Sequence, residues 1–402
     1  MNNKPLMVVF GGGNIGRGFI GQLFLQADYD VVFIDAAEFL VNELNRVRFY
    51  TLQLVSNEQE QKLQLGPVSA CLITDTEQVN SIVARADIMA TAVGVPILPH
   101  IAGTLAGGLR AREDAGNTDT LDILVCENKL GAGDYLKSLI LEADPNLDKM
   151  LSSKIGFVET SIGRMVPVLS EQDRKQDPLL IRSEPYSELP VDAAGFRGNL
   201  PAVSSLKPFQ PFHFYHERKL FIHNMGHAVT AYLGWLAGAA TIAEAIAMPR
   251  LRSLVEEIMR QSGRALAVKY QVDYTQLEDH IQDLLSRFSN QKLGDTVVRV
   301  GRDPLRKLDA DDRLSGALRL IIENEEEPYQ LTNAIAAAML FAPDGDPTAP
   351  ALQKMLEEQG IEALLEKHSG LGDTKYDRWR RQIAAQVKMF QAIYPDIDKN
   401  SI

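Results

Sequence analysis

The chain has 402 residues, which is long enough for two or three domains with sizeable cores and excludes a small disulfide-stapled scaffold. Hydrophobic residues make up 45% of it and charged residues 23%, a composition typical of a folded globular protein and not of a disordered one. The 41 lysines and arginines against 53 aspartates and glutamates give a net charge of −12, which argues against a surface that binds nucleic acid or anionic lipid.

The cysteines and the amino terminus indicate a compartment. Two cysteines, Cys71 and Cys126, in so long a chain favour a reducing environment. The apolar run at residues 6–10 is too short for a signal peptide or a membrane span. We therefore expect a cytoplasmic protein with no membrane partner. The sequence leaves open whether it is a monomer or a dimer.

The amino-terminal part alternates predicted strands and helices. Short apolar runs indicate strands at residues 6–10, 29–35, 87–94 and 121–126. Apolar stripes at helical spacing follow the first two strands, at residues 15–24 and 39–44. This alternation predicts parallel βαβ units, so we expect an α/β fold whose first 165 or so residues form a Rossmann-like, doubly wound parallel sheet.

The pattern changes in the middle of the chain. From about Val168 to Phe214 the periodicity weakens and proline recurs, which predicts a connecting region with short strands and no helices. Beyond it, helices are predicted at residues 228–246, 251–269, 277–288, 331–341, 352–365 and 376–394. The chain is thus expected to have a Rossmann domain with a short-strand extension over residues 1–205, followed by a mainly α-helical domain over residues 206–402.

A glycine-rich loop follows the first predicted strand and opens a helix. Six residues match the G-x-G-x-x-G pattern: Gly11, Gly12, Gly13, Asn14, Ile15 and Gly16. In this context backbone N–H groups can meet a pyrophosphate that side chains would otherwise block. Asp35 ends the second strand, where its carboxylate can accept both ribose hydroxyls of NAD and would repel the 2′-phosphate of NADP.

We therefore predict an NAD site at this loop, with Ala92 and Val93 from the end of the 87–94 strand beside it. Arg17 is either a phosphate contact or a solvated surface charge. The alternative for the whole loop is a Rossmann fold that has lost its nucleotide.

Three polar residues just after the connecting region share one face of a predicted helix. At about 100° per residue, Lys219, Asn224 and His227 fall near about 0°, 140° and 80°. Such a face could line a cleft. The structural alternative is a solvated lysine, a capping or surface asparagine and a buried histidine with its hydrogen bonds satisfied.

Four separated motifs resemble those of the polyol-specific long-chain dehydrogenase/reductase family, in the same order along nearly the whole chain. They are Phe10 to Gly21, Cys126-Glu127-Asn128, Lys219-x4-Asn224-x2-His227, and Arg299 to Leu308. The resemblance implies a Rossmann domain followed by a helical domain and an activity that needs no metal. It also implies that Lys219 is the acid/base, that Asn224 and His227 are its companions, and that Asn128 is a further donor at the reacting oxygen.

The likeness is nearest to the members of that family that act on mannitol 1-phosphate. It implies an NAD-dependent oxidoreductase that interconverts D-mannitol 1-phosphate and D-fructose 6-phosphate. Two alternatives stay open: a related enzyme for mannitol, fructuronate or tagaturonate, and a non-catalytic NAD-binding sensor. Four residues differ from the family's usual pattern and bear on substrate preference more than on reaction type: Gly163, Ile222, His223 and Met225.

The chemistry sets a requirement on the lysine. Oxidising a secondary alcohol needs a base for the hydroxyl proton, and an ordinary lysine with a pKa of about 10.4 is protonated at neutral pH. Burial or nearby positive charge must therefore lower the pKa of Lys219 toward about 7 to 8. Asn128 and Asn224 can donate N–H groups to the oxygen as its charge develops.

A cluster of positive residues predicts an anchor for the substrate phosphate. It consists of Arg299, Arg302, Arg306 and Lys307. Guanidinium groups match phosphate oxygens in pairs of hydrogen bonds, so we predict that these four contact the substrate. The alternative is a salt-bridged surface segment, because Asp309, Asp311 and Asp312 follow at once.

Histidines are concentrated in one short stretch, at His213, His216, His223 and His227. The last two have the i, i+4 spacing of a helical metal pair. The acid of an H-E-x-x-H motif is missing, since residue 224 is Asn, and the sequence marks no third ligand. We therefore predict no metal site.

Overall fold

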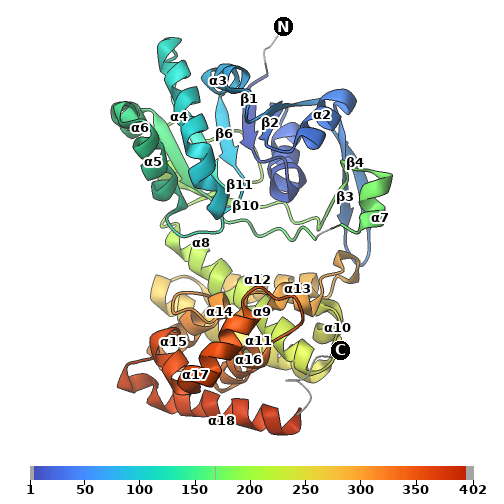
Figure 1. The fold of residues 1–402 in the computed structure, drawn as a ribbon, viewed down its shortest axis with the longest axis vertical. Helices are drawn as coiled ribbons and strands as arrows, with labels where there is room; N and C mark the ends of the chain where they lie inside the picture. Colours follow the sequence, from blue (N-terminus) through green and yellow to red (C-terminus); the bar gives the residue numbers. More distant parts are fainter. Residues whose placement is uncertain (1–3, 168, 395–402) are drawn as a thin grey trace. The chain divides into compact units, whose positions relative to one another are not determined.

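The computed structural model describes residues 4–167 and 169–394, and the contacts divide the chain into two compact units, residues 1–215 and 216–402. The first unit contains the large sheet and the second is helical (Figure 1). Val168, named above as the start of the connecting region, lies outside the described residues, as do both ends of the chain.

A parallel sheet of six strands forms the centre of the first unit, in the order β5-β2-β1-β6-β7-β8. Its strands are β1 (Leu6–Phe10), β2 (Asp30–Asp35), β5 (Val68–Leu72), β6 (Ile88–Thr91), β7 (Leu121–Val125) and β8 (Ile155–Glu159). The strand order reverses between β1 and β6, and ligands of such sheets bind outside the carboxyl ends of the strands at that point. The predicted Rossmann-like, doubly wound sheet is confirmed.

Burial on both faces explains why β1 is an uninterrupted apolar run. Met7 and Val9 pack in the core on one face of the sheet, whereas Val8 and Phe10 pack in the core on the other. The first face is covered by η1 (Gly16–Gly21), a single turn of π-helix that we call a π-turn, and by α1 (Gln22–Gln26) and α2 (Glu38–Val47). The second face is covered by α3 (Thr76–Arg85), α4 (Leu98–Asp114), α5 (Ala132–Ala143) and α6 (Asp148–Ser153).

Two small sheets complete this unit. One has the order β4-β3-β9, from β4 (Glu60–Leu65), β3 (Tyr50–Val55) and β9 (Ile181–Ser183), and the other pairs β10 (Leu189–Asp192) with β11 (Leu206–Phe209). The connecting region thus contains short strands, as predicted. It also contains the short helix α7 (Glu171–Gln176), which was not predicted and which Ser170 caps by accepting a hydrogen bond from Asp173 N.

The carboxyl-terminal part of the chain is helical, as predicted. Its helices are α8 (His213–Arg218), the π-turn η5 (Lys219–Asn224), α9 (Met225–Leu236), α10 (Ile242–Ala247), α11 (Pro249–Tyr270), α12 (Tyr274–Phe288), α13 (Val297–Gly301), α14 (Pro304–Lys307), α15 (Ser315–Glu323), α16 (Tyr329–Leu340), α17 (Ala349–Lys367) and α18 (Asp377–Ile393). Helix α9 is apolar on nearly every side because it is the buried centre of this part, in contact with α10, α11, α13 and α16.

Two of the predicted helices differ in the structure. The one predicted at residues 228–246 is divided into α9 and α10, since Gly238 adopts a left-handed conformation (φ 77°) and Thr241 caps a new helix through a hydrogen bond from Glu244 N. In α17 the backbone of Gly360 (φ 81°) leaves the helical conformation. Among the described residues, no helix is both long and apolar enough to cross a membrane.

Candidate active site

The glycine-rich loop lies against the end of β6. Gly11 has φ 99°, and a Cβ atom there would lie 2.5 Å from the carbonyl oxygen of Ala92. A Cβ on Gly16 would lie 1.8 Å from the carbonyl oxygen of Gly11, whereas one on Gly13 would meet no atom within 4 Å. Gly11 and Gly16 therefore allow a tight turn in which no side chain would fit, whereas Gly13 faces open space.

Asp35 joins this loop to the start of α2. Its Oδ2 accepts a hydrogen bond from Gly12 N (2.7 Å) and its Oδ1 accepts one from Ala37 N (2.8 Å). The structure thus brings Asp35, the glycines, Ala92 and Val93 together, with the Val93 side chain near Gly11. A half-buried carboxylate at this position suits hydroxyl donors and opposes a phosphate.

Arg17 is not the solvated surface charge that one interpretation of the sequence expected. The side chain is buried, with Nη1 donating to the carbonyl oxygen of Leu179 (2.7 Å) and Nε to that of Gly12. Its own carbonyl oxygen accepts from Tyr50 Oη. Arg17 therefore holds the glycine-rich loop to the connecting region, and its predicted contact with a phosphate stays a prediction.

Glu127 is a buried carboxylate to which its motif, Cys126-Glu127-Asn128, assigned no role. Its two oxygens accept hydrogen bonds from the backbone N–H groups of Val93 (3.0 Å) and Gly94 (2.8 Å). Burial raises the pKa of Glu127, and these hydrogen bonds oppose the shift. Glu127 thereby fixes the segment after β6. The neighbouring Asn128 is exposed in the first unit, and its predicted role at the reacting oxygen stays a prediction.

Lys219, Asn224 and His227 lie on one continuous helix, made of α8, η5 and α9. In a π-turn the hydrogen bonds join residues five apart, so Lys219 and Asn224 are neighbours on the same face. Asn224 and His227 are three apart on the α-helical side and are also neighbours. The wide turn, and not a regular helical period, brings Lys219 and Asn224 to the same side of the helix.

A hydroxyl group from another helix binds inside this turn. Ser262 of α11 is fully buried, and its Oγ donates to the carbonyl oxygen of Phe221 (2.7 Å). Next to the turn, Gly226 leaves room for the Met259 side chain, since a Cβ there would lie 2.6 Å from Met259 Sδ. Helix α11 therefore stabilises the π-turn through a hydrogen bond from Ser262 and the packing of Met259.

The environment of Lys219 makes the ammonium form less stable than it is in an ordinary lysine. The residue is half-buried, and burial together with the positive charge of Arg313 lowers the pKa of Lys219 to about 8. A group with this pKa exchanges protons readily near neutral pH.

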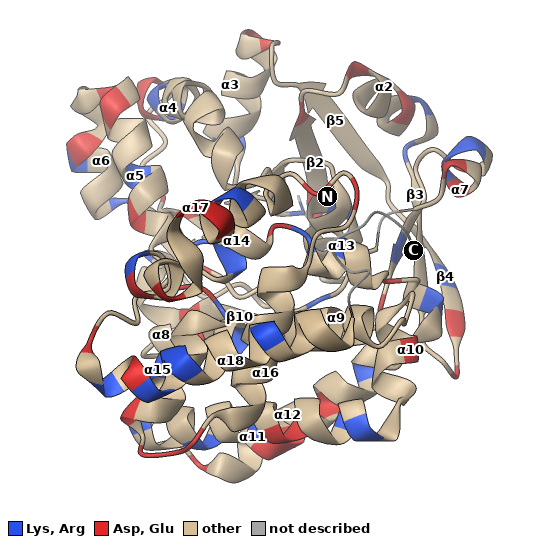
Figure 2. Cartoon of the chain, turned by 60° about the horizontal axis from the view of Figure 1, so that its bottom comes forward, with Lys and Arg blue, Asp and Glu red and all other residues tan. Residues whose placement is uncertain are grey.

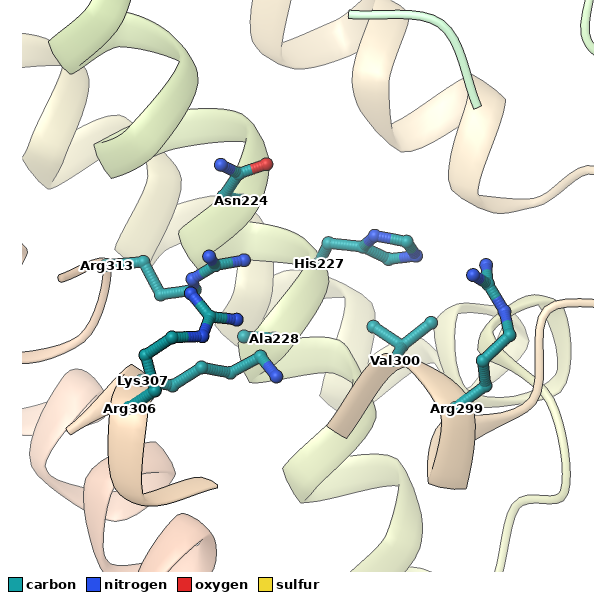
Figure 3. A pocket seen from close by; sticks show the side chains of 8 residues that line it. All are labelled: Asn224, His227, Ala228, Arg299, Val300, Arg306, Lys307 and Arg313. Atoms are coloured by element: carbon teal, nitrogen blue, oxygen red, sulfur yellow. The ribbon is translucent and has the colours of Figure 1, made fainter. Parts of the chain in front are cut away.

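A pocket of about 190 Å³ opens beside this helix in the second unit. It is lined by Asn224, His227, Ala228, Arg299, Val300, Arg306, Lys307 and Arg313. Figure 3 shows Arg306, Lys307 and Arg313 gathered on one side, with His227 and Arg299 on the other. Three of the four predicted phosphate contacts thus line one pocket. Arg302 does not line it, but its carbonyl oxygen accepts a hydrogen bond from Lys307 Nζ.

Carboxylates pair with the pocket arginines, and one of them, Asp312, belongs to the aspartate run on which the surface alternative was based. Arg299 pairs with Asp295, Arg306 with Asp303 (2.8 Å) and Asp312 (2.8 Å), and Arg313 with Asp312 (2.7 Å). Lys307 differs: among the described residues it forms no ion pair within 4 Å.

The ammonium group of Lys307 is thus held without a countercharge in ion-pair contact. The residue is buried, and burial, Arg313 and Arg306 lower the pKa of Lys307 to about 7. An anion in the pocket would relieve that unfavourable environment.

His223 and His227, the two histidines with the spacing of a metal pair, lie one turn apart on the same helix. The rings of His223 and His227 have centroids 6.3 Å apart, and no group of three or more His, Cys, Asp or Glu residues in the described part of the chain is arranged to hold a metal. The His227 ring stacks on Phe288 at 4.9 Å, and burial lowers the pKa of His227 to about 4.

Sequence reasoning missed Arg313 and Asp295 in this pocket. Arg313 comes directly after the aspartates that follow the predicted phosphate contacts. Asp295 comes four residues before Arg299 in the sequence and forms an ion pair with it. That i, i+4 spacing was the available signal for Asp295.

Two domain models of one family match the chain along most of its length. The mannitol dehydrogenase Rossmann domain matches residues 5–205, and the mannitol dehydrogenase C-terminal domain matches residues 212–391. Among its relatives is the mannitol-1-phosphate 5-dehydrogenase of Bacillus subtilis (strain 168), 39% identical over 367 residues, 90% of this chain and 94% of the relative. The enzyme of that name from Geobacillus stearothermophilus is 39% identical over 369 residues, 91% of this chain and 95% of the relative.

Two solved structures share the fold. A D-sorbitol dehydrogenase in substrate-free form has a TM-score of 0.82 at 18% identity and covers 98% of this chain and 94% of its own. A ternary complex of Pseudomonas fluorescens mannitol 2-dehydrogenase with NAD and D-mannitol has a TM-score of 0.75 at 17% identity, over 98% and 92%. The two domain matches, together with the 39% identity to the Bacillus subtilis enzyme, show that the chain belongs to the mannitol dehydrogenase family.

Proposed function

We propose that this chain is a cytoplasmic, NAD-dependent oxidoreductase that interconverts D-mannitol 1-phosphate and D-fructose 6-phosphate. Residues 1–205 bind NAD, and residues 206–402 bind the sugar phosphate and supply the acid/base. The relatives named mannitol-1-phosphate 5-dehydrogenase support the substrate. The two buried, free cysteines suit a reducing compartment.

The first unit has the features that a dinucleotide needs. Gly11 and Gly16 have no room for a Cβ atom, and Asp35 presents a carboxylate beside the loop. The pyrophosphate would be held by backbone groups of Gly11, Gly12, Gly13, Asn14, Ile15 and Gly16, with Asp35 on the ribose and Ala92 and Val93 alongside. NAD, when bound, supplies hydride acceptance from the alcohol and, as NADH, hydride return to the ketone.

The observation that carries the phosphate assignment is Lys307, which is buried and close enough to Arg306 and Arg313 for both charges to act on it. A phosphate supplies the missing negative charge, and the guanidinium groups of Arg299, Arg306 and Arg313 can each offer paired donors to it. Arg302 contributes its carbonyl oxygen to Lys307.

Proton transfer is assigned to Lys219. In oxidation the neutral amine takes the proton of the substrate hydroxyl, and in reduction the ammonium group returns it. Asn224, its neighbour on the π-turn, donates an amide N–H to the same oxygen as negative charge develops there. His227, which lines the phosphate pocket, orients the sugar. No step in this scheme requires a metal.

A substrate panel tests the proposal. NADH consumption is followed with fructose 6-phosphate, fructose, fructuronate and tagaturonate at matched concentrations. We expect kcat/KM for fructose 6-phosphate to exceed that for fructose by about 100-fold or more, the size of two charge-assisted hydrogen bonds. Equal turnover with and without phosphate would contradict the assignment, and preferred turnover of a hexuronate would favour the alternative substrate class.

A substitution at Lys307 tests whether the preference for the phosphorylated substrate comes from this pocket. Lys307→Met should raise KM for fructose 6-phosphate by about 10-fold or more and leave fructose turnover unchanged, because only one substrate carries the anion. Lys292→Met, at an exposed lysine, is the matched control and should leave both unchanged.

A further inference from the structure

Two buried polar atoms face each other beside the pocket without a hydrogen bond to any described residue. They are Nε2 of His227 and Oδ2 of Asp295, which lie 3.6 Å apart. This distance is slightly too long for a hydrogen bond. Buried polar atoms in native proteins nearly always have a partner, so a pair of this kind needs a reason. Hydrogen bonds of active sites are often long without substrate and shorten when it binds.

The surroundings hold both groups in place. Asp295 is 7% exposed, and its other oxygen, Oδ1, pairs with Arg299. Its backbone carbonyl accepts from Ile242 N, which anchors the residue to α10. The His227 ring lies flat on Phe288, with 12° between the planes. The stacking contact therefore fixes the plane of the His227 ring.

The His227 ring is neutral near pH 7. Burial lowers the pKa of His227, the positive charges of Arg299, Arg313 and Lys307 lower it further, and only Asp295 acts in the opposite direction. A neutral imidazole has one N–H donor and one acceptor nitrogen, and the partner of one nitrogen decides which is which.

We propose that Asp295 is a positioning residue: it accepts the Nε2–H of His227 and thereby leaves Nδ1 as an unprotonated acceptor for a hydroxyl of the sugar. Since Nε2 is enclosed, Nδ1 is the nitrogen left to meet a ligand in the pocket that His227 lines. The assignment rests on the proposed function for the identity of the ligand, but the tautomer itself does not.

Histidine tautomers can be read directly by NMR. The full-length protein, labelled with 15N-histidine and without ligand at pH 7, gives separate signals for protonated and unprotonated ring nitrogens. A His227→Gln variant identifies the signals of His227 by their loss. We expect Nε2 to be protonated and Nδ1 unprotonated.

Asp295→Asn should reverse this pattern. Its amide oxygen can keep the contact with Arg299, and its NH2 group then faces Nε2, which becomes an acceptor, so the proton moves to Nδ1. Asp311→Asn is the matched control because Asp311 is 91% exposed, pairs with Arg319 and is not among the charges that shift the pKa of His227; it should leave the tautomer unchanged. A parent protein with Nδ1 protonated, or an unchanged tautomer in Asp295→Asn, would overturn the proposal.

Kinetics provide the second readout. Asp295→Asn should lower kcat for fructose 6-phosphate reduction by about 10-fold or more, because a histidine in the wrong tautomer offers a donor where the sugar needs an acceptor. If Asp295 served only Arg299, KM alone would rise and the tautomer would stay, which would overturn the proposal. A parent without activity on sugar phosphates would refute the proposed function and leave the NMR result standing.

Discussion

At the scale of single residues, the properties of Lys219 come from two sources acting in the same direction. Burial and the charge of Arg313 both disfavour the ammonium form. The sequence could predict that a catalytic lysine needs a lowered pKa. It could not predict that Arg313 supplies part of the effect, because that residue is far away in the chain and only the fold brings it near.

The pH dependence of polyol oxidation tests this environment. The rate should rise with pH, with an inflection near about 8, and level off above it, because Lys219 loses its proton and becomes a base. Arg313→Gln removes a positive charge that disfavours protonation, so the inflection should move to higher pH. Arg299→Gln, whose charge acts on His227 and not on Lys219, should leave the inflection in place. An inflection that stays or falls in Arg313→Gln would contradict the account.

At the scale of elements, long periodic segments were predictable and local interruptions were not. The apolar stripes of α11 and α12 predicted those helices well, whereas α13 and α14, with five and four residues, are too short to show a period. The π-turn was also missed. Its sequence signal is the five-residue interval from Lys219 to Asn224, which a regular α-helical wheel spreads apart.

The support of the π-turn can be tested at Ser262. Ser262→Ala removes the buried hydrogen bond to Phe221 O, so the free energy of unfolding should fall by about 1 to 3 kcal/mol and kcat should fall with it. Ser253→Ala removes an exposed hydroxyl from the same helix and should change stability by less than about 0.5 kcal/mol. Chemical denaturation and steady-state kinetics measure both. A Ser262→Ala protein with unchanged stability and kcat would show that the turn needs no such support.

The glycine-rich loop permits a matched pair of substitutions. Gly16→Ala places a methyl group against the Gly11 carbonyl oxygen, so it should destabilise the protein by about 1 to 3 kcal/mol and weaken NADH binding. Gly13→Ala places its methyl group in open space and should leave stability nearly unchanged. Thermal unfolding and NADH fluorescence titration separate the two effects. Equal loss of stability in both variants would show that the close packing of Gly16 is unimportant.

At the scale of the whole molecule, the net charge and the pocket have opposite signs. Figure 2 shows both signs of charge interspersed along α11, α12 and α15, and ion pairs such as Arg260 with Glu278 join α11 to α12. The net charge of −12 excluded a general anion-binding surface but could not exclude one local positive site. Arg306, Lys307 and Arg313 form that site inside an acidic protein.

The sequence predicted the architecture because motif order and strand–helix alternation are local signals that hold along the chain. It also indicated most candidate residues. Asp295, Glu127 and Arg313 escaped prediction since their roles depend on contacts between segments, such as Glu127 reaching the backbone after β6. Arg17 shows the converse: a residue in a binding motif whose side chain the fold uses for packing.

The central claim is that the amine of Lys219 transfers the proton, and removal of that amine tests it most directly. Fructose 6-phosphate reduction is measured in single turnover with NADH for the parent and for Lys219→Ala, alongside the NADH dissociation constant from fluorescence. The account predicts a rate lower by about 10³-fold with NADH affinity unchanged. A Lys219→Ala protein that reduces the ketose as fast as the parent would contradict it.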